Sequence, residues 1–108
     1  MNIFDVYGLN ESTLEEACNL VEKALQIRMQ AHESSYHCGN YFRLDLSNGA
    51  NLILQQNYDS FDGEWTEESF KSSKYLLYVS KHDYPDEIKS LMLSEDSRVS
   101  FLRRDEIL

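Results

Sequence analysis

The spacing of hydrophobic residues predicts that the chain mixes strands and helices. Over residues 2–7 the side chains alternate, with Phe4 and Val6 on one side and a mixed set on the other. A period of two predicts a β-strand, and Gly8 and Asn10 are expected to end it.

The next segment has the period of an amphipathic helix. Ser12 is expected to cap its start in a capping box with Glu15, because a serine hydroxyl can accept a free backbone N–H. Arg28 falls within the apolar arc of this helix. We favour an exposed head with a packed stem, and the alternative is a bond to a carboxylate at a sheet edge or a binding surface. The apolar positions are Leu14, Ala17, Leu20, Val21, Ala24, Leu25 and Ile27.

Residues 41–55 predict a β-hairpin around Asn48-Gly49, which is a strong turn signal. A three-residue loop, with Gly49 left-handed as a bulge, gathers six apolar residues on one face, whereas a two-residue loop scatters them. The predicted pairs are Phe42–Leu54, Leu44–Leu52 and Leu46–Ala50. The other face is mostly polar and is expected to meet water or a partner; it carries Tyr41, Arg43, Asp45, Asn51, Ile53 and Gln55.

The last third of the chain predicts strand, helix and strand. Residues 74–80 are apolar on both faces, as is typical of a central strand. A helix is expected to open around Pro85 and to bury Ile88, Leu91 and Met92. A polar turn at 94–97 and a short strand at 99–102 follow, before a charged tail at 103–106.

These elements predict one α+β domain over residues 1–108. The expected order is β-α-β-β-β-α-β, in a single, mostly antiparallel sheet with the helices on one face. The order of the strands within the sheet does not follow from the pattern.

Charge narrows the choice of partner. Nineteen acidic and ten basic residues give a formal net charge of −9. Such a surface repels phosphate backbones and anionic membranes, so we expect neither nucleic acid nor a membrane as a direct ligand. It attracts basic partners and speeds their association, although solubility alone is the simpler explanation of the charge.

Signals for export, membrane insertion and disulfide formation are not found. The first residues do not resemble a signal peptide, and no apolar run is long enough to predict a membrane span. Cys18 and Cys38 do not make up a disulfide framework. A cytoplasmic protein with reduced thiols is therefore expected.

Residues 57–73 are the candidate functional segment, since a connection this long in a compact domain is often functional. Acidic and aromatic residues alternate in it, and no basic residue precedes Lys71. Rings amid charge of one sign are typical of a protein interface. The alternative is that Phe61, Trp65 and Phe70 belong to the core. The predicted partner-binding residues are Tyr58, Asp59, Phe61, Asp62, Glu64, Trp65, Glu67 and Glu68.

Motifs for catalysis and for cofactors are not found: the sequence has no Gly-rich phosphate loop, nucleophile elbow or H-E-x-x-H. His32, His37 and Cys38, with Cys18 or His82, are the best metal candidates but lack the spacing of a zinc site. Cys38 does not suit a nucleophile activated by His37, because neighbours on an extended chain point to opposite faces. We expect no enzyme activity, metal or cofactor.

With these residues in view, the sequence resembles the small immunity proteins of bacterial contact-dependent growth inhibition and related polymorphic toxin systems. The resemblance rests on three stretches: Phe4 to Asn10; His32 to His37 leading into Gly39 to Arg43; and Leu54 to Asp59 through Glu64-Trp65 to Leu76 to Val79. It implies a protein made beside a toxin, commonly a basic nuclease, which it binds and neutralises.

A second hypothesis uses the polar sheet face around Tyr41, Arg43 and Gln55. Here the protein is a ligand-binding domain or a regulatory adaptor, and a concave pocket with a titratable group of shifted pKa would favour it over an inhibitor.

Overall fold

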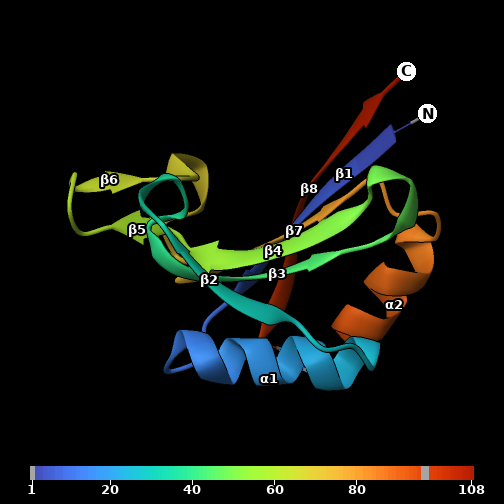
Figure 1. The fold of residues 1–108 in the computed structure, drawn as a ribbon, viewed down its shortest axis with the longest axis horizontal. Coiled ribbons are helices and arrows are strands. Elements are labelled where there is room, and N and C mark those ends of the chain that lie inside the picture. The colour runs from blue at the N-terminus through green and yellow to red at the C-terminus, as the bar shows by residue number, and fades with distance from the viewer. Residues whose placement is uncertain (1, 96–97) are drawn as a thin grey trace.

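Six strands form one antiparallel sheet, and both helices pack on the same face of it, in this computed structural model, which describes residues 2–95 and 98–108 (Figure 1). The strand order is β2-β3-β4-β7-β1-β8. The α+β class is confirmed, but β2 and a separate two-stranded hairpin were not predicted. The strands of the main sheet are β1 (Asn2–Leu9), β2 (Gln30–Ser34), β3 (Gly39–Asp45), β4 (Asn51–Gln56), β7 (Tyr75–Ser80) and β8 (Val99–Ile107). The hairpin is β5 (Tyr58–Asp59) with β6 (Glu64–Trp65), and the helices are α1 (Leu14–Leu25) and α2 (Pro85–Glu95).

The first strand is longer than predicted because Gly8 continues it to Leu9. Gly8 pairs with Leu76 of β7 and with Ser100 of β8. A Cβ atom at this position would overlap Ser73 Oγ and would lie 2.9 Å from Ser73 Cβ. Glycine is therefore needed for a close approach between segments, and not for a turn.

Helix α1 is shorter than predicted. Its N-cap is Thr13 and not Ser12, and the Thr13 hydroxyl accepts the Glu16 N–H at 3.1 Å. The helix stops at Leu25 because Gln26 takes a left-handed conformation, with φ of 54°. The predicted cap is therefore one residue too early, because Ser12 and Thr13 are adjacent and both carry a hydroxyl group.

The chain after α1 forms an edge strand that the sequence analysis missed. The Met29 N–H donates to the Glu22 carboxylate at 2.8 Å, and β2 then pairs with β3 along its length. Its four exposed residues and short length leave no hydrophobic alternation to detect. Arg28 is exposed and lies outside the helix, so the position inferred for it on the helical arc was wrong.

The β3–β4 hairpin has the predicted register, which confirms the bulged loop. The Leu46 N–H donates to the Ala50 carbonyl at 2.8 Å, and Gly49 has φ of 80°. Since a one-residue slip would turn the apolar face to solvent, side-chain pattern was sufficient to decide the pairing. The observed pairs include Phe42–Leu54 and Leu44–Leu52.

The last third of the chain departs from the prediction at two places. Strand β7 is central, between β4 and β1, as expected. Helix α2 buries Ile88 and Met92, but Leu91 is 45% exposed. Ile88 and Met92 are four residues apart and share the side of the helix that packs on the core and α1, whereas Leu91 lies beside that row. The helix continues to Glu95, and the remainder of the predicted turn lies outside the described residues.

The charged stretch 103–106 is a strand and not a tail. It continues β8 to Ile107 in antiparallel pairing with β1. The side chains of Arg103 and Arg104 stay within the fold because each finds carboxylate partners from another element. The charged residues of this stretch therefore form ion pairs within the fold and do not mark a solvent-exposed tail.

A buried ion pair joins β1, β8 and α2. Arg104 binds the carboxylate of Asp5 through two hydrogen bonds of 2.8 and 2.9 Å, and its third contact, at 2.8 Å, is to Asp86 of α2. Asp5 is 1% exposed. A buried carboxylate needs this kind of bidentate partner, because its hydration is lost on folding.

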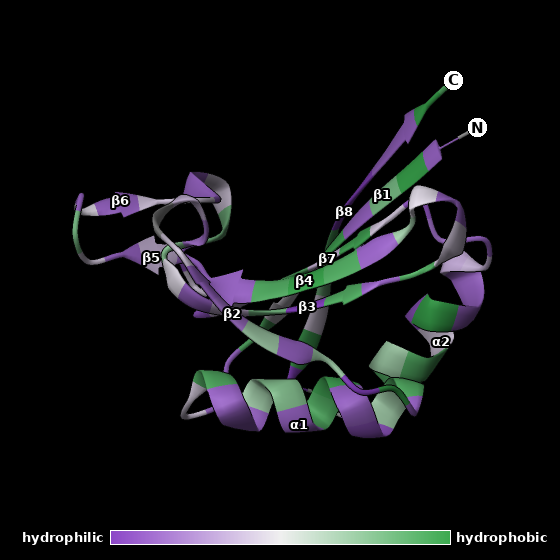
Figure 2. Ribbon diagram, in the orientation of Figure 1, coloured by the Kyte–Doolittle hydropathy of each residue, from purple (hydrophilic) through white to green (hydrophobic). Residues whose placement is uncertain are grey.

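The hydrophobic core lies between the sheet and the two helices. Strand β4 is hydrophobic along its middle and points its apolar face at the helices, whereas β6 is hydrophilic (Figure 2). The side chains that make up this core include Tyr7, Leu9, Val21, Leu52, Leu54, Leu77, Val79 and Met92. Neither α1 nor α2 covers the opposite face of the sheet (Figure 1), which we call the open face.

Replacing Gly8 by alanine is expected to destabilise the protein by about 1–3 kcal/mol, because the new methyl group overlaps Ser73. Urea unfolding followed by circular dichroism measures the change. The double variant Gly8→Ala, Ser73→Gly should recover part of the loss, and a purely additive cost would show that the close approach is not the cause.

Candidate functional site

The acidic–aromatic segment 57–73 is folded rather than irregular. Strands β5 and β6 pair through Tyr58–Trp65 and Asp59–Glu64, and the Gly63 N–H donates to the Asp59 carbonyl at 2.8 Å. A 3₁₀ turn over Glu68–Phe70 completes the segment. The hairpin extends beyond the end of the sheet, away from both chain termini (Figure 1).

The buried side chain of Asn57 holds the base of the segment. Its Oδ1 accepts the Glu67 N–H at 2.8 Å, and its Nδ2 donates to the Phe70 and Ser73 carbonyls at 3.0 Å each. Asn57 is 0% exposed, and its backbone N–H donates to the Lys74 carbonyl at 2.9 Å. One amide thus satisfies backbone groups that would otherwise be buried without partners.

The aromatic residues of the hairpin are outside the main core. Phe61 at the tip is 85% exposed and Tyr58 is 43% exposed. Trp65 is half-buried, lies 5.0 Å from the Tyr58 ring between centroids, and carries the Lys71 ammonium at 5.9 Å. The alternative that Phe61, Trp65 and Phe70 belong to the core is wrong, because none of the three joins the main cluster.

Four of the five predicted carboxylates face outward, and the fifth does not. Asp62, Glu64 and Glu68 are exposed, and Asp59 is half-buried. The Asp59 carboxylate accepts the Phe61 N–H at 2.9 Å, which shapes the tip of the hairpin. Asp62 and Glu64 follow the exposed ring of Phe61 in the hairpin, and Glu68 lies in the turn after it, so the segment exposes both charge and apolar area.

Glu67 faces the sheet and is bound by two side chains. Arg103 donates to it at 2.8 and 3.4 Å, and the Tyr78 hydroxyl donates at 2.9 Å. Burial alone would raise the pKa of Glu67, but these hydrogen bonds and the charge of Arg103 hold the pKa below its usual value. Burial and the Glu67 carboxylate together raise the pKa of Tyr78. Glu67 therefore anchors the segment, and a partner meets it only at its edge.

The open sheet face connects to the segment through a chain of polar side chains. His37 Nδ1 lies 2.9 Å from Gln55 Oε1, and Gln55 Nε2 and Cys38 Sγ both lie 3.4 Å from Thr66 Oγ1. Arg43 is instead paired with Asp45 at 2.8 Å. Of the residues predicted for a ligand site on this face, Gln55 therefore lies beside segment 57–73, whereas Arg43 does not.

Tyr41 stacks with the two histidines that were considered as metal ligands. Its ring centroid lies 5.4 Å from that of His32 and 4.3 Å from that of His37. Within residues 2–95 and 98–108, no three His, Cys, Asp or Glu side chains gather as metal ligands. Cys18 is buried in the core, which raises its thiol pKa to about 12.

No protein-family model matches the chain, and no curated protein matches it significantly. Neither helix of the described part is both long and apolar enough to cross a membrane.

Sequence analysis missed Tyr78, Arg103 and His37 as neighbours of the candidate site. The alternation of side chains in β7 places Tyr78 on the face opposite to Tyr75, but the sequence does not show which segment contacts that face. Arg103 was assigned to a tail, and a register shift between Phe101 and Arg103 interrupts the alternation that would have placed it in the strand. The contact between Arg103 and Glu67 links residues 36 positions apart, which no local pattern reports.

The Asn57→Ala variant is expected to lose about 2–4 kcal/mol of stability, since the Glu67 N–H and two carbonyls lose their partner. Urea unfolding measures it, with Asn40→Ala, at an exposed strand position, as the control. Equal effects of the two variants would contradict the anchoring role.

The Glu67→Gln variant is expected to change the acid dependence of stability. Because the folded pKa of Glu67 is lowered, its contribution is present above about pH 4.3, the usual value, and is lost as pH falls through the lowered folded value. The stability difference between wild type and variant should therefore be largest at neutral pH and shrink in acid. Thermal unfolding at several pH values checks this, with the exposed Glu68→Gln as control; a constant difference would argue against the ion pair.

Proposed function

We propose that this protein is an immunity protein, which binds a basic domain of a cognate toxin and neutralises it. The observation that carries the proposal is the β5–β6 hairpin with the turn after it, which together expose the ring of Phe61 and the carboxylates of Asp62, Glu64 and Glu68. Aromatic anchors within charge of one sign suit a partner that offers lysine or arginine around an apolar patch. The proposed site of action is the cytoplasm of the producing cell.

The electrostatics support a basic partner such as a nuclease. The net charge of −9 steers a positively charged domain toward this protein and can raise association rates to about 10⁸ M⁻¹s⁻¹ at low salt. A nuclease surface that binds phosphates carries lysine and arginine side chains, and an acidic inhibitor can bind the same side chains. The inhibitor then competes with nucleic acid or excludes it from a neighbouring surface.

The rigidity of the hairpin base supports a role in tight binding. Asn57 and Glu67 fix the segment to the sheet, so its acids and rings keep their positions before a partner arrives. A preorganised surface loses less conformational entropy on binding than a free loop does.

Removing the outward charge should slow association. The triple variant Asp62→Asn, Glu64→Gln, Glu68→Gln is expected to bind the toxin domain about tenfold more slowly at low salt and to lose most of its salt dependence. The control variant removes the same charge from exposed positions elsewhere, through Glu15→Gln, Asp83→Asn and Glu87→Gln. A pull-down from the native host, followed by stopped-flow kinetics on the captured domain, measures both.

Truncating the tip should speed dissociation. Phe61→Ser removes the exposed anchor without touching the Asn57 contacts, and about a tenfold rise in dissociation rate is expected. Trp65→Ala should act in the same direction, with some loss of hairpin order through Tyr58. Capture of an acidic protein, or equal binding by the triple variant and its control, would refute the proposed surface.

Protection of cells tests the activity itself. Expression of the captured domain should stop bacterial growth unless this protein is made with it. Growth arrest that this protein does not relieve would refute neutralisation and favour the regulatory adaptor.

A further inference from the structure

The open face of the sheet carries two adjoining cavities, of about 460 and 520 Å³. Tyr78 and Ser80 of β7 line both, so the two form one hollow across the middle of the sheet. We call this hollow the sheet groove. Its size is that of a site for a small organic molecule.

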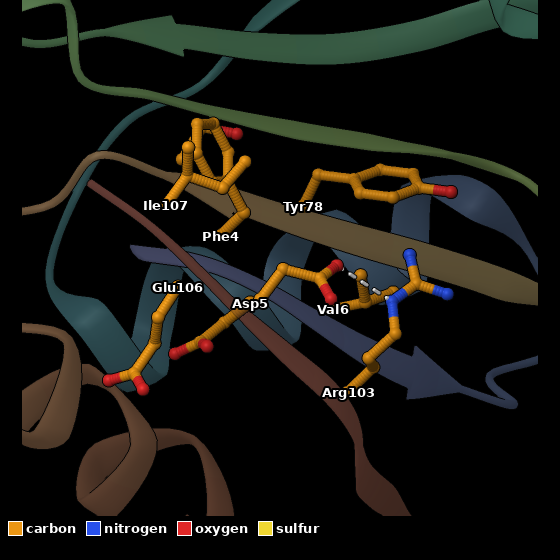
Figure 3. A pocket seen from close by; sticks show the side chains of 9 residues that line it. Phe4, Asp5, Val6, Tyr78, Arg103, Glu106 and Ile107 are labelled. Carbon is orange, nitrogen blue, oxygen red and sulfur yellow. Dashed lines mark hydrogen bonds and ion pairs between the residues drawn. The ribbon is translucent and has the colours of Figure 1, made fainter. Parts of the chain in front are cut away.

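Apolar side chains from three strands point into one half of the groove. Figure 3 shows Phe4, Tyr78 and Ile107 on the same side of the strands, whereas Glu106 points to the other side. Val6 continues the apolar lining beneath them, and Ile53 of β4 does so in the other half. The groove therefore offers two aromatic rings and an aliphatic floor.

The charged groups of the groove leave a net negative charge. Arg103 donates two hydrogen bonds to Glu67, and its Nε donates to Asp105 Oδ2 at 3.0 Å. One guanidinium thus serves two carboxylates, and Asp105, with 53% of its side chain exposed, keeps Oδ1 without a hydrogen bond among the described residues. A cation can approach this oxygen. An anion is disfavoured because Arg103, Glu67 and Asp105 together carry one more negative than positive charge.

The two other carboxylates in the lining are directed away from the groove, because Glu106 points to the other side of the strands and Asp5 is bound there. Asp5 is bound by Arg104 through both of its oxygens, on the helix side of the sheet. Polar groups at the other end of the groove, His37 and Gln55, are neutral hydrogen-bonding side chains bound to one another. Among the described residues that line the groove, the excess negative charge therefore lies beside the aromatic end.

We propose that the sheet groove binds a small aromatic cation. The ligand's ring packs between Phe4 and Tyr78, and its ammonium group lies against Asp105. Aromatic faces and a carboxylate both attract a cation, and the net charge of −9 adds to the attraction. This site is distinct from the hairpin tip, so it can exist whether or not the protein binds a toxin.

Tryptamine and indole-3-acetate test the proposal, because they share one ring system and carry opposite charges. Tryptamine titrated into ¹⁵N-labelled protein should shift the amide signals of Val6, Tyr78, Ser80 and Asp105 and saturate at low millimolar concentration or below. Indole-3-acetate should bind at least about tenfold more weakly.

A matched pair of variants isolates the carboxylate. Asp105→Asn removes the excess charge and should weaken tryptamine binding about fivefold. Asp45→Asn is the control, because Asp45 pairs with Arg43 in the same i, i+2 arrangement on the same face, outside the groove. It changes the net charge equally and should leave the affinity unchanged.

The spectra separate each outcome from loss of fold, since an unfolded variant loses its amide dispersion. Equal affinity for the two indoles, shifts confined to residues 58–65, or no saturation at about 10 mM would each overturn the proposal. A drop in affinity with Asp45→Asn equal to that with Asp105→Asn would also overturn it. None of these results depends on a toxin, so the groove and the hairpin are tested separately.

Discussion

The amide of Asn57 is the contact on which the acidic hairpin depends. Strands β4 and β7 are neighbours in the sheet, yet the chain between them is long enough to form a hairpin and a 3₁₀ turn of its own. A buried backbone without partners would be too costly at the point where this segment leaves the sheet. Asn57, at the start of the segment, meets that constraint by bonding the backbone of Glu67, Phe70 and Ser73 at once.

The acidic residues of the chain divide into two groups according to what they contact. Asp5 and Glu67 are bound by arginines of β8 and hold elements together, while Asp62, Glu64 and Glu68 remain free for a partner. Composition counts both groups alike, so the total of nineteen acidic residues overstates the number that are available for binding. The hairpin tip is where free charge and exposed aromatic area meet, and this coincidence supports the immunity proposal more than the total of −9 does.

Local pattern was sufficient to predict register and strand position where burial decides which residue types lie on each face of a strand. The register of β3 and β4 followed from keeping six apolar residues on one face, and β7 was identified as central from its two apolar faces. Pattern failed at β2, which is exposed on nearly every residue, and at Gly8, whose neighbour Ser73 is distant in sequence. It also failed at Arg103 and Arg104, where charge suggested solvent and the structure supplies carboxylates.

By itself, the sequence determined the α+β class, the main hairpin register, the net charge and the acidic–aromatic character of residues 57–73, because all of these are properties of neighbouring residues. Tertiary structure decided which of those acids are free, where the rings lie and how the sheet groove is lined. Such features depend on pairs such as Glu67 with Arg103, which meet only after non-local strands have paired. The physical reason is that burial and ion pairing are set by the whole fold, whereas periodicity and turn chemistry act over a few residues.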